Sequence, residues 1–304
     1  MPSAGQKKSP PSNIKEKTKA GKEDPWADYE EEKDSVCRWE FGINLGGYFP
    51  NKYSANYYNG VSGNDNTVGY VMSNTYWYRD IKLALNAADT VTIDGYPTNM
   101  HYHVALTGGV FLRFNFNRKN GIFLLANYTR LKAEDVVTME VDPKNYLTIP
   151  DIRMIPIAGK EGRAILELGY QRSFPMKSKI YYFVNGSVTM CYTHVIKSVL
   201  VVEGREYNLI NIYGNNNYVP NSNTQEFTTN QYGLGWGFTL GGGIGLPLTD
   251  QFSLEPGVSM QYYPVNLTGY SLYKPCFTIY MRILLGFSHK IAIHPHRDTN
   301  NNSH

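Results

Sequence analysis

Large apolar side chains alternate with small or polar ones along residues 231–245, and this stretch guides the interpretation of the whole chain. Gly, Gln or Thr fills the positions between the apolar residues, which are Tyr232, Leu234, Trp236, Phe238, Leu240 and Ile244. A strand sends alternate side chains to opposite faces, so one face here is apolar and the other nearly bare. This pattern predicts a β-barrel whose apolar face meets lipid and whose small residues line the interior.

Seven further segments show the same period of two, the primary sequence signal for a strand with one buried face. The predicted strands are the Gly-rich stretch above and residues 36–49, 101–116, 121–139, 160–174, 179–200, 251–263 and 276–288. Aromatic residues stand ten positions apart on three of them, at Trp39 and Phe49, Phe252 and Tyr262, and Phe277 and Phe287. Ten residues of tilted strand rise about 25 Å, the height of the apolar band of a membrane barrel.

The connections between the predicted strands alternate in length. Three are short turns, near Asn120, Pro175 and Pro247, and three are long loops, over 50–100, 140–159 and 201–230. Short turns on one side and long loops on the other are typical of an outer-membrane barrel whose short turns face the periplasm. The sequence therefore predicts an all-β fold, an eight-stranded antiparallel up-and-down transmembrane β-barrel over residues 36–288 with long extracellular loops.

Composition agrees with a barrel and argues against other classes. The 304 residues include 25 Tyr and 28 Gly, and Tyr is enriched where membranes meet water. The sequence has no run of about 18 apolar residues that could form a spanning helix. A formal net charge of +3 is too small to indicate a nucleic-acid partner.

The two ends of the chain differ in composition from the predicted barrel. Residues 1–35 are rich first in Lys and then in acidic side chains, and such a segment cannot bury enough apolar surface to fold alone. They also lack the apolar region of a secretory signal, so we expect export to need a signal that these residues do not supply. We expect a disordered periplasmic extension over 1–35 and a polar periplasmic tail over 289–304.

Charged residues on the polar face predict an ion network inside the barrel. Five of them share one depth near the short-turn end, namely Glu40, Arg113, Glu167, Glu255 and Arg282. We expect Arg282 between Glu40 and Glu255, and Arg113 on the other side of Glu40. Glu167 is left with Arg163 or Tyr181 as candidate partners. Buried charges persist when paired, so a structural plug is predicted, with a proton or ion path as the alternative. An eight-stranded barrel is filled by its own side chains, so no open pore is expected.

The first long loop is dense in aromatic residues and is the candidate binding surface for a ligand or partner. The candidates are Tyr57, Tyr58, Tyr76, Trp77 and Tyr78, because rigid amphipathic aromatics are what recognition surfaces use. Apolar spacing from Tyr78 to Leu85 predicts a short amphipathic helix that could lie over the barrel mouth. An aromatic-rich solvated loop without a specific ligand is the alternative.

The sequence carries no nucleophile elbow, P-loop or paired metal-binding histidine motif. His101 and His103 are predicted on the inner face at the outer end of the second strand. Two histidines at this spacing could hold a metal, but a third ligand is not evident. We therefore interpret them as solvated side chains that line the mouth of the barrel. No catalytic residue, metal or cofactor is predicted.

Several pieces of the chain together resemble one family. They are ANYYNG over 55–60, MHY over 100–102, GKEGR over 159–163, LGY over 168–170 and IYMRILLGF over 279–287. With these pieces the chain resembles the eight-stranded outer-membrane β-barrel proteins of Bacteroidota across about residues 36–288. The resemblance implies an OmpA- or OmpX-like barrel inserted by the barrel-assembly machinery, which would read the aromatic end of the last strand at Phe287. It also implies an accessory role, since such barrels often serve larger outer-membrane machines, including secretion complexes.

Three hypotheses for function follow. The first is a non-enzymatic structural or accessory subunit in the outer membrane of a Gram-negative bacterium, with outer-membrane lipid and other outer-membrane proteins as its partners. The second is an outer-membrane enzyme that modifies lipid with His101 or His103 as the base. The third is a soluble lipocalin-like carrier, which requires the apolar face to point inward.

Overall fold

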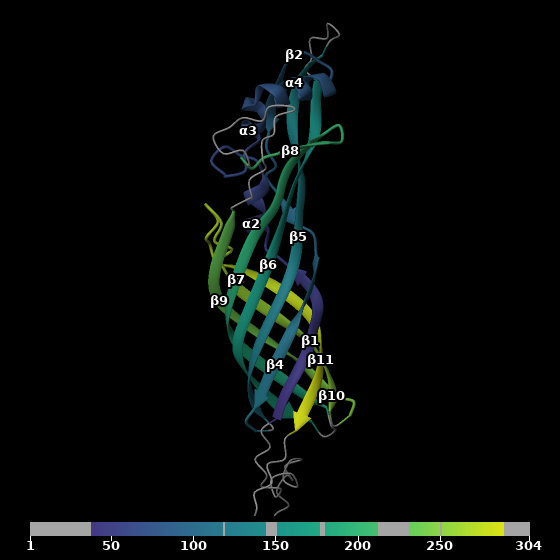
Figure 1. Cartoon of the computed structure of the whole chain (residues 1–304), viewed down its shortest axis with the longest axis vertical. Helices are drawn as coiled ribbons and strands as arrows, with labels where there is room; N and C mark the ends of the chain where they lie inside the picture. The colour runs from purple at the N-terminus through teal and green to yellow at the C-terminus, as the bar shows by residue number, and fades with distance from the viewer. Residues whose placement is uncertain are drawn as a thin grey trace, which may run out of the picture. The chain divides into compact units, whose positions relative to one another are not determined.

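Eight antiparallel strands close into a ring within the part of the chain that the structure describes (Figure 1). They are β1 (Arg38–Phe49), β4 (Ala105–Asn115), β5 (Asn120–Pro143), β6 (Asp151–Pro175), β7 (Tyr181–Val202), β9 (Tyr232–Pro247), β10 (Phe252–Tyr263) and β11 (Lys274–Ser288). Each pairs with its neighbour in the ring, and β1 pairs with β11 to close it. The predicted eight-stranded up-and-down barrel is confirmed.

The structure is a computed structural model. It describes residues 38–117, 119–143, 151–176, 180–211, 231–249 and 251–288, all within the unit Ser35–His304. The predicted extension over 1–35 and the tail over 289–304 lie outside the described residues. Most of the predicted loop over 201–230 lies outside them as well.

The apolar face of the sheet points outward. On β9, the side chains of Leu234, Trp236 and Phe238 are 43–55% exposed, whereas Thr239 on the opposite face is 2% exposed. Position 235 on the inner face needs glycine, because a Cβ there would lie 1.8 Å from the carbonyl oxygen of Pro264. The lipocalin-like hypothesis required the opposite orientation and is wrong.

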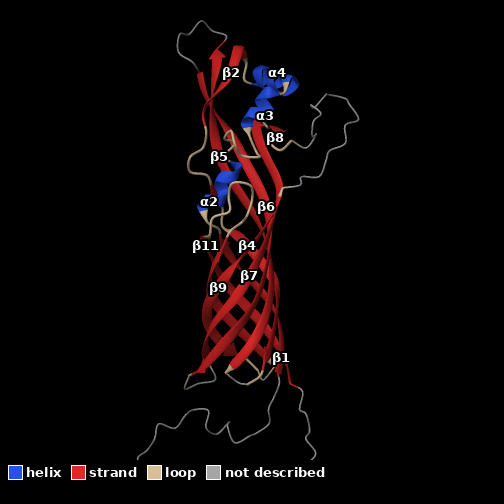
Figure 2. Cartoon of the chain, turned by 90° about the vertical axis from the view of Figure 1, so that its left-hand side faces the viewer, coloured by secondary structure: helices blue, strands red, loops and turns tan. Residues whose placement is uncertain are grey.

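Strands β5, β6 and β7 extend well beyond the ring (Figures 1 and 2). The pairing of β5 with β6 runs without a break from Asn120 and Arg172 to Val141 and Asp151. The predicted loop over 140–159 is therefore shorter than expected, because β5 continues to Pro143 and β6 begins at Asp151. Beyond the apolar band, β5 carries charged outward residues such as Arg130, Lys132 and Glu140, so its hydrophobic alternation fades before the strand ends.

The long connection after β1 folds into short elements instead of remaining an open loop. They are the helices α2 (Lys52–Ala55), η1 (Asn56–Tyr58), α3 (Val68–Ser73) and α4 (Thr75–Ala84), followed by the strands β2 (Ala87–Gly95) and β3 (His101–Tyr102). Asn74 caps α4 by accepting hydrogen bonds from the backbone N–H groups of Tyr76 and Trp77, which satisfies donors that have no partner in the first turn. Helix α4 covers most of the helix predicted from Tyr78 to Leu85.

No described helix is long and apolar enough to cross a membrane.

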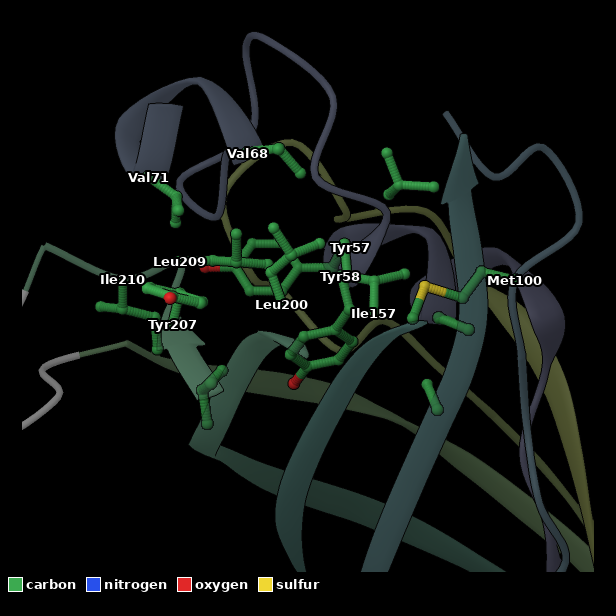
Figure 3. Close-up of a cluster of buried hydrophobic side chains, with 14 of the residues drawn as sticks. Tyr57, Tyr58, Val68, Val71, Met100, Ile157, Leu200, Tyr207, Leu209 and Ile210 are labelled. Atoms are coloured by element: carbon green, nitrogen blue, oxygen red, sulfur yellow. The ribbon is translucent and has the colours of Figure 1, made fainter. Parts of the chain in front are cut away.

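We call the folded region outside the ring the cap. It comprises residues 50–104, the described residues of β5 and β6 between 131 and 157, residues 199–202 of β7, and β8 (Arg205–Asn208) with the residues that follow it to 211. Strand β2 pairs with β5, and β8 pairs with β7, so the cap is built directly on the extended wall strands. Figure 3 shows part of its core, drawn from helices and strands together. The labelled side chains are Tyr57, Tyr58, Val68, Val71, Met100, Ile157, Leu200, Tyr207, Leu209 and Ile210.

Candidate functional site: the lumen and the cap

A network of buried charges crosses the lumen near the short-turn end. We call it the lower network, and it consists of Glu40, Arg113, Glu255 and Arg282. Arg113 faces Glu40 across the β1–β4 pair, donates from Nε to its Oε2 at 2.6 Å, and donates from Nη1 to Glu255 Oε1 at 2.8 Å. One guanidinium therefore joins carboxylates from β1 and β10, and its hydrogen bonds run across the interior.

The arrangement within the lower network differs from the prediction. Arg113, not Arg282, bridges Glu40 and Glu255. Arg282 lies 3.8 Å from Glu255, and its guanidinium stacks over Phe111 and Tyr280 at 4.3 and 4.4 Å from the ring centroids. The aromatic side chains give Arg282 a cation–π environment. The ion bridge is made by Arg113, because the register of β1 and β4 places it opposite Glu40.

Glu167 is buried on β6 with neutral partners. Ser187 donates to one of its carboxylate oxygens and Gln261 to the other, both at 3.1 Å. The two partners suggested from sequence bond elsewhere, since Tyr181 donates to Glu255 and Arg163 to Glu161. The structure thus places Glu167 in the lumen but outside the chain of ion pairs.

A second network closes the mouth of the barrel, and sequence reasoning missed it. Glu161 and Arg163 on β6 are both fully buried and are paired at 2.7 Å. The remaining donors of Arg163 reach Tyr48 on β1 at 2.9 Å and Ser54 on α2 at 3.0 Å. Glu161 accepts from Tyr58 at 2.6 Å and from Tyr102 at 3.0 Å. We call these six residues the upper network.

The upper network joins the cap to the barrel wall. Its two charges come from a wall strand, whereas Ser54, Tyr58 and Tyr102 come from α2, η1 and β3 of the cap. A buried ion pair is stable only if its other polar atoms are hydrogen-bonded, and here the cap supplies all of those hydrogen bonds except the one to Tyr48. The signal was present in the sequence, because Glu161 and Arg163 have the same strand parity as the inward Glu167.

The aromatic residues predicted to bind a partner divide into buried and accessible ones. Tyr57, Tyr58 and Trp77 are buried in the cap, Tyr78 is half-buried and hydrogen-bonds Val91, and Tyr76 is exposed. For the three buried side chains the structure corrects the prediction, because they form the core of the cap and present no binding surface. Burial raises the pKa of Tyr57 and Tyr58 above its ordinary value, so both hydroxyls stay protonated as donors.

The outward face of helix α4 is the accessible part of this candidate surface. Tyr76 and Leu83 are exposed hydrophobic residues, and Arg79 between them is also exposed. Their spacing of three and four places all three side chains on one helix face. Trp77 and Ile81 on the opposite face are buried, so the helix holds its outward residues on a fixed support.

The two histidines lie on the outside of the structure and not on the inner face that the sequence predicted. Both are exposed, with ring centroids 6.1 Å apart. His103 Nε2 lies 3.2 Å from Glu134, and His101 Nδ1 lies 3.3 Å from the carbonyl oxygen of Asn99. Within the described residues, no group of three or more His, Cys, Asp and Glu side chains is arranged to hold a metal ion.

No protein-family model and no curated protein matches this chain. Among solved structures it is similar to the Neisserial surface protein NspA, with a TM-score of 0.36 and 7% identity over 82% of this chain and 97% of that one. It is similar to the outer membrane protein OprG from Pseudomonas aeruginosa, with a TM-score of 0.36 and 10% identity over 84% and 98%.

A third similar structure is Ail, the attachment invasion locus protein of Yersinia pestis, with a TM-score of 0.33 and 9% identity over 83% of this chain and 99% of that one. With identities and TM-scores this low, these similarities carry no argument about activity or partners. The functional conclusions below therefore rest on the wall, the two networks and the cap.

Proposed function

We propose that this protein is an integral outer-membrane β-barrel that serves as a structural or accessory subunit of an envelope or secretion complex. In this role the barrel is an anchor without an open pore, and the cap is the part offered to partners outside the cell. The observation that carries the proposal is the upper network, because it fixes a folded cap over a lumen that is already filled.

The wall supports a location in the membrane. The outward side chains of β1, from Trp39 to Leu45, are 45–52% exposed and apolar, as a lipid-facing surface requires. A surface of this kind in water would be a continuous exposed apolar belt, which soluble monomers avoid. The short turns would then lie in the periplasm and the cap outside the cell. Assignment to the barrels of Bacteroidota rests on the sequence pieces quoted above and is part of the proposal.

The lumen supports a closed barrel. Arg113 on β4 joins carboxylates from β1 and β10 in the lower network, and Arg163 with Glu161 fills the mouth in the upper one. Ion pairs that cross an eight-stranded barrel leave little room for solvent. We therefore expect purified protein in a planar bilayer to show no stable conductance, and steady single-channel currents would contradict the closed barrel.

The face of α4 supports binding of a partner by the cap. Exposed aromatic and aliphatic side chains on a rigid element resemble the anchors of known interfaces. The test is co-purification in mild detergent of the wild type, of Tyr76→Ser/Leu83→Ser, and of the matched control Leu272→Ser/Tyr273→Ser, which removes another exposed Leu and Tyr.

An accessory subunit should carry at least one outer-membrane protein in reproducible stoichiometry. The α4 variant should lose that protein and the control should keep it. Wild-type protein that purifies alone under conditions preserving other envelope complexes would contradict the accessory role.

A further inference from the structure

Three lysines face one another on the outer surface of adjacent strands, just beyond the apolar band. Lys132 on β5 is in register with Lys160 on β6, and Lys160 is in register with Lys197 on β7. Lys132 and Lys160 are exposed, and Lys197 is half-buried. Like charges directly opposite each other destabilise a sheet, so this row of cations needs a counter-charge.

The protein supplies only part of that counter-charge. Glu134 pairs with Lys132, and Glu206 pairs with Lys197. Among the described residues, no carboxylate lies within the 4.0 Å ion-pair distance of Lys160 or of the nearby Arg130. Arg130 instead stacks over Tyr128, 5.9 Å from the ring centroid. Four cations therefore share two carboxylates. The two that lack a carboxylate, Arg130 and Lys160, lie on the neighbouring strands β5 and β6.

Arg130 lies at the height of lipid headgroups, and the row of lysines lies at their outer edge. Tyr128 and Tyr192 point outward two residues below Arg130 and His194, and both are more than 40% exposed. Tyrosines favour the boundary between acyl chains and headgroups. Along tilted strands, Arg130 lies about 5 Å and Lys160 about 10 Å beyond this boundary. The headgroup layer of a bilayer is about 5–8 Å thick on each side, so Arg130 lies within it, and the long lysine side chains reach its outer edge.

Gly162 makes room for the ring of Tyr128 among the basic side chains. It is in register with Arg130 on one side and with His194 on the other, and it lies two residues from Lys160. A Cβ at this position would lie 2.6 Å from the hydroxyl oxygen of Tyr128. The absence of a side chain at Gly162 thus lets the ring of Tyr128 lie over the strand, so that its hydroxyl is held between Arg130 and His194.

We propose that Arg130, Lys132, Lys160 and Lys197, which we call the basic patch, bind the phosphate of an anionic lipid in the leaflet around the cap. The inference rests on the proposed function, since it needs the barrel in a membrane. Arginine offers a planar fork to phosphate and lysine a point charge. The lipid phosphate supplies the missing counter-charge, and its acyl chains lie along the apolar wall below.

The test is lipid retention measured by native mass spectrometry. The protein is reconstituted in vesicles of phosphatidylcholine and phosphatidic acid with equal acyl chains and then released in mild detergent. Wild-type protein should retain phosphatidic acid preferentially. Arg130→Gln/Lys160→Gln should lower the preference about 30-fold, the effect of two charges near a headgroup. The control Arg79→Gln/Arg153→Gln removes two exposed cap cations and should keep it.

Equal retention of the two lipids by wild-type protein, or unchanged preference in Arg130→Gln/Lys160→Gln, would overturn the inference. Release of phosphatidic acid by millimolar inorganic phosphate would also overturn it, since it would show an ion site and not a lipid site. Insertion and heat-modifiable gel mobility are measured on the same vesicles. Normal insertion without lipid preference refutes the basic patch alone, whereas failure to insert refutes the membrane barrel as well.

Discussion

The barrel contains two buried arginine–glutamate networks that have similar chemistry and hold different parts of the molecule. In the lower network Arg113 joins Glu40 and Glu255, which both belong to the wall. In the upper network Arg163 and Glu161 come from one wall strand, and residues of the cap together with Tyr48 of the wall satisfy their remaining hydrogen-bonding groups. The lower network therefore secures the ring, and the upper network fixes the cap to it.

The difference shows how a stable wall can carry a separately supported cap. Residues on neighbouring strands are held in place by backbone pairing whether or not their side chains interact. The elements α2 and η1 are short, and helices of this length have little stability of their own. Loss of the upper network should therefore loosen the cap first, whereas loss of the lower network should weaken the ring as a unit.

The largest effect is expected from Arg163→Ala. It leaves Glu161 buried without its ion partner and removes the hydrogen bonds to Tyr48 and Ser54. Breaking a buried pair from one side costs about 3–5 kcal/mol. We expect a matching loss in the free energy of unfolding in detergent, together with proteolysis of the cap while the barrel fragment persists.

The control for this prediction is Glu161→Gln/Arg163→Met, which removes both charges. It should recover part of the loss, because no unpaired charge remains buried. Equal resistance of the cap to proteolysis in wild type and Arg163→Ala would show that the upper network does not hold the cap in place.

The next effect separates the two arginines of the lower network. Arg113→Ala removes the nearest ion partner of both Glu40 and Glu255 and should cost about 3–5 kcal/mol. Arg282→Ala loses a longer contact and its aromatic stacking and should cost about 2 kcal/mol. The heat-shift temperature on gels should fall in the order wild type, Arg282→Ala, Arg113→Ala. An equal fall in both variants would contradict the assignment of the bridge to Arg113.

A smaller effect is expected from removing one hydroxyl of the upper network. Tyr58→Phe deletes the bond to the buried carboxylate of Glu161, which is worth about 1.5–3 kcal/mol for a charged partner. Tyr57→Phe is the matched control, since its bond to Asp65 is only part-buried. Chemical denaturation should show the greater loss of unfolding free energy for Tyr58→Phe. A greater loss for Tyr57→Phe would show that the hydrogen bond from Tyr58 to Glu161 does not stabilise the cap.

The smallest effect is expected at the exposed aromatic residue of the cap. Tyr76→Ser should change the free energy of unfolding by less than about 0.5 kcal/mol, because Tyr76 packs outside the core. Trp77→Ala, one residue along, should cost about 3–5 kcal/mol. Similar losses in thermal unfolding of the two variants would show that Tyr76 also belongs to the core.

The wall could be predicted from sequence because a period of two fixes which residues face lipid. The charges at Glu40, Arg113, Glu255 and Arg282 were placed in the lumen by the same parity. Their ion pairs could not be predicted, because these depend on which side chains meet across the interior. The strand pattern shows only which strands are adjacent. Strand order therefore predicts that Arg282 bridges Glu40 and Glu255, whereas in the structure Arg113 makes that bridge.

The cap was less predictable for a different physical reason. Aromatic density in a long loop is the same whether the rings pack together or face solvent, so Tyr57 and Trp77 could not be told from Tyr76 by composition. Their burial depends on β5 and β6 continuing past the band to provide a support. Beyond residue 139 the outward positions of β5 are the charged Glu140 and Asp142, so its apolar alternation ends there. On β6, Ile152 and Met154 form a pattern too short to predict a strand.

The most direct test of a lipid-facing wall beneath a water-exposed cap is quenching of tryptophan fluorescence by lipids brominated along their acyl chains. Single-tryptophan variants that retain Trp39, Trp236 or Trp77 are compared in vesicles, with the other tryptophans changed to Phe. Trp39 and Trp236 point outward from the wall, and Trp77 is buried in the cap. We predict strong quenching of Trp39 and Trp236 and none of Trp77. Quenching of Trp77 with Trp39 and Trp236 unaffected would contradict the account.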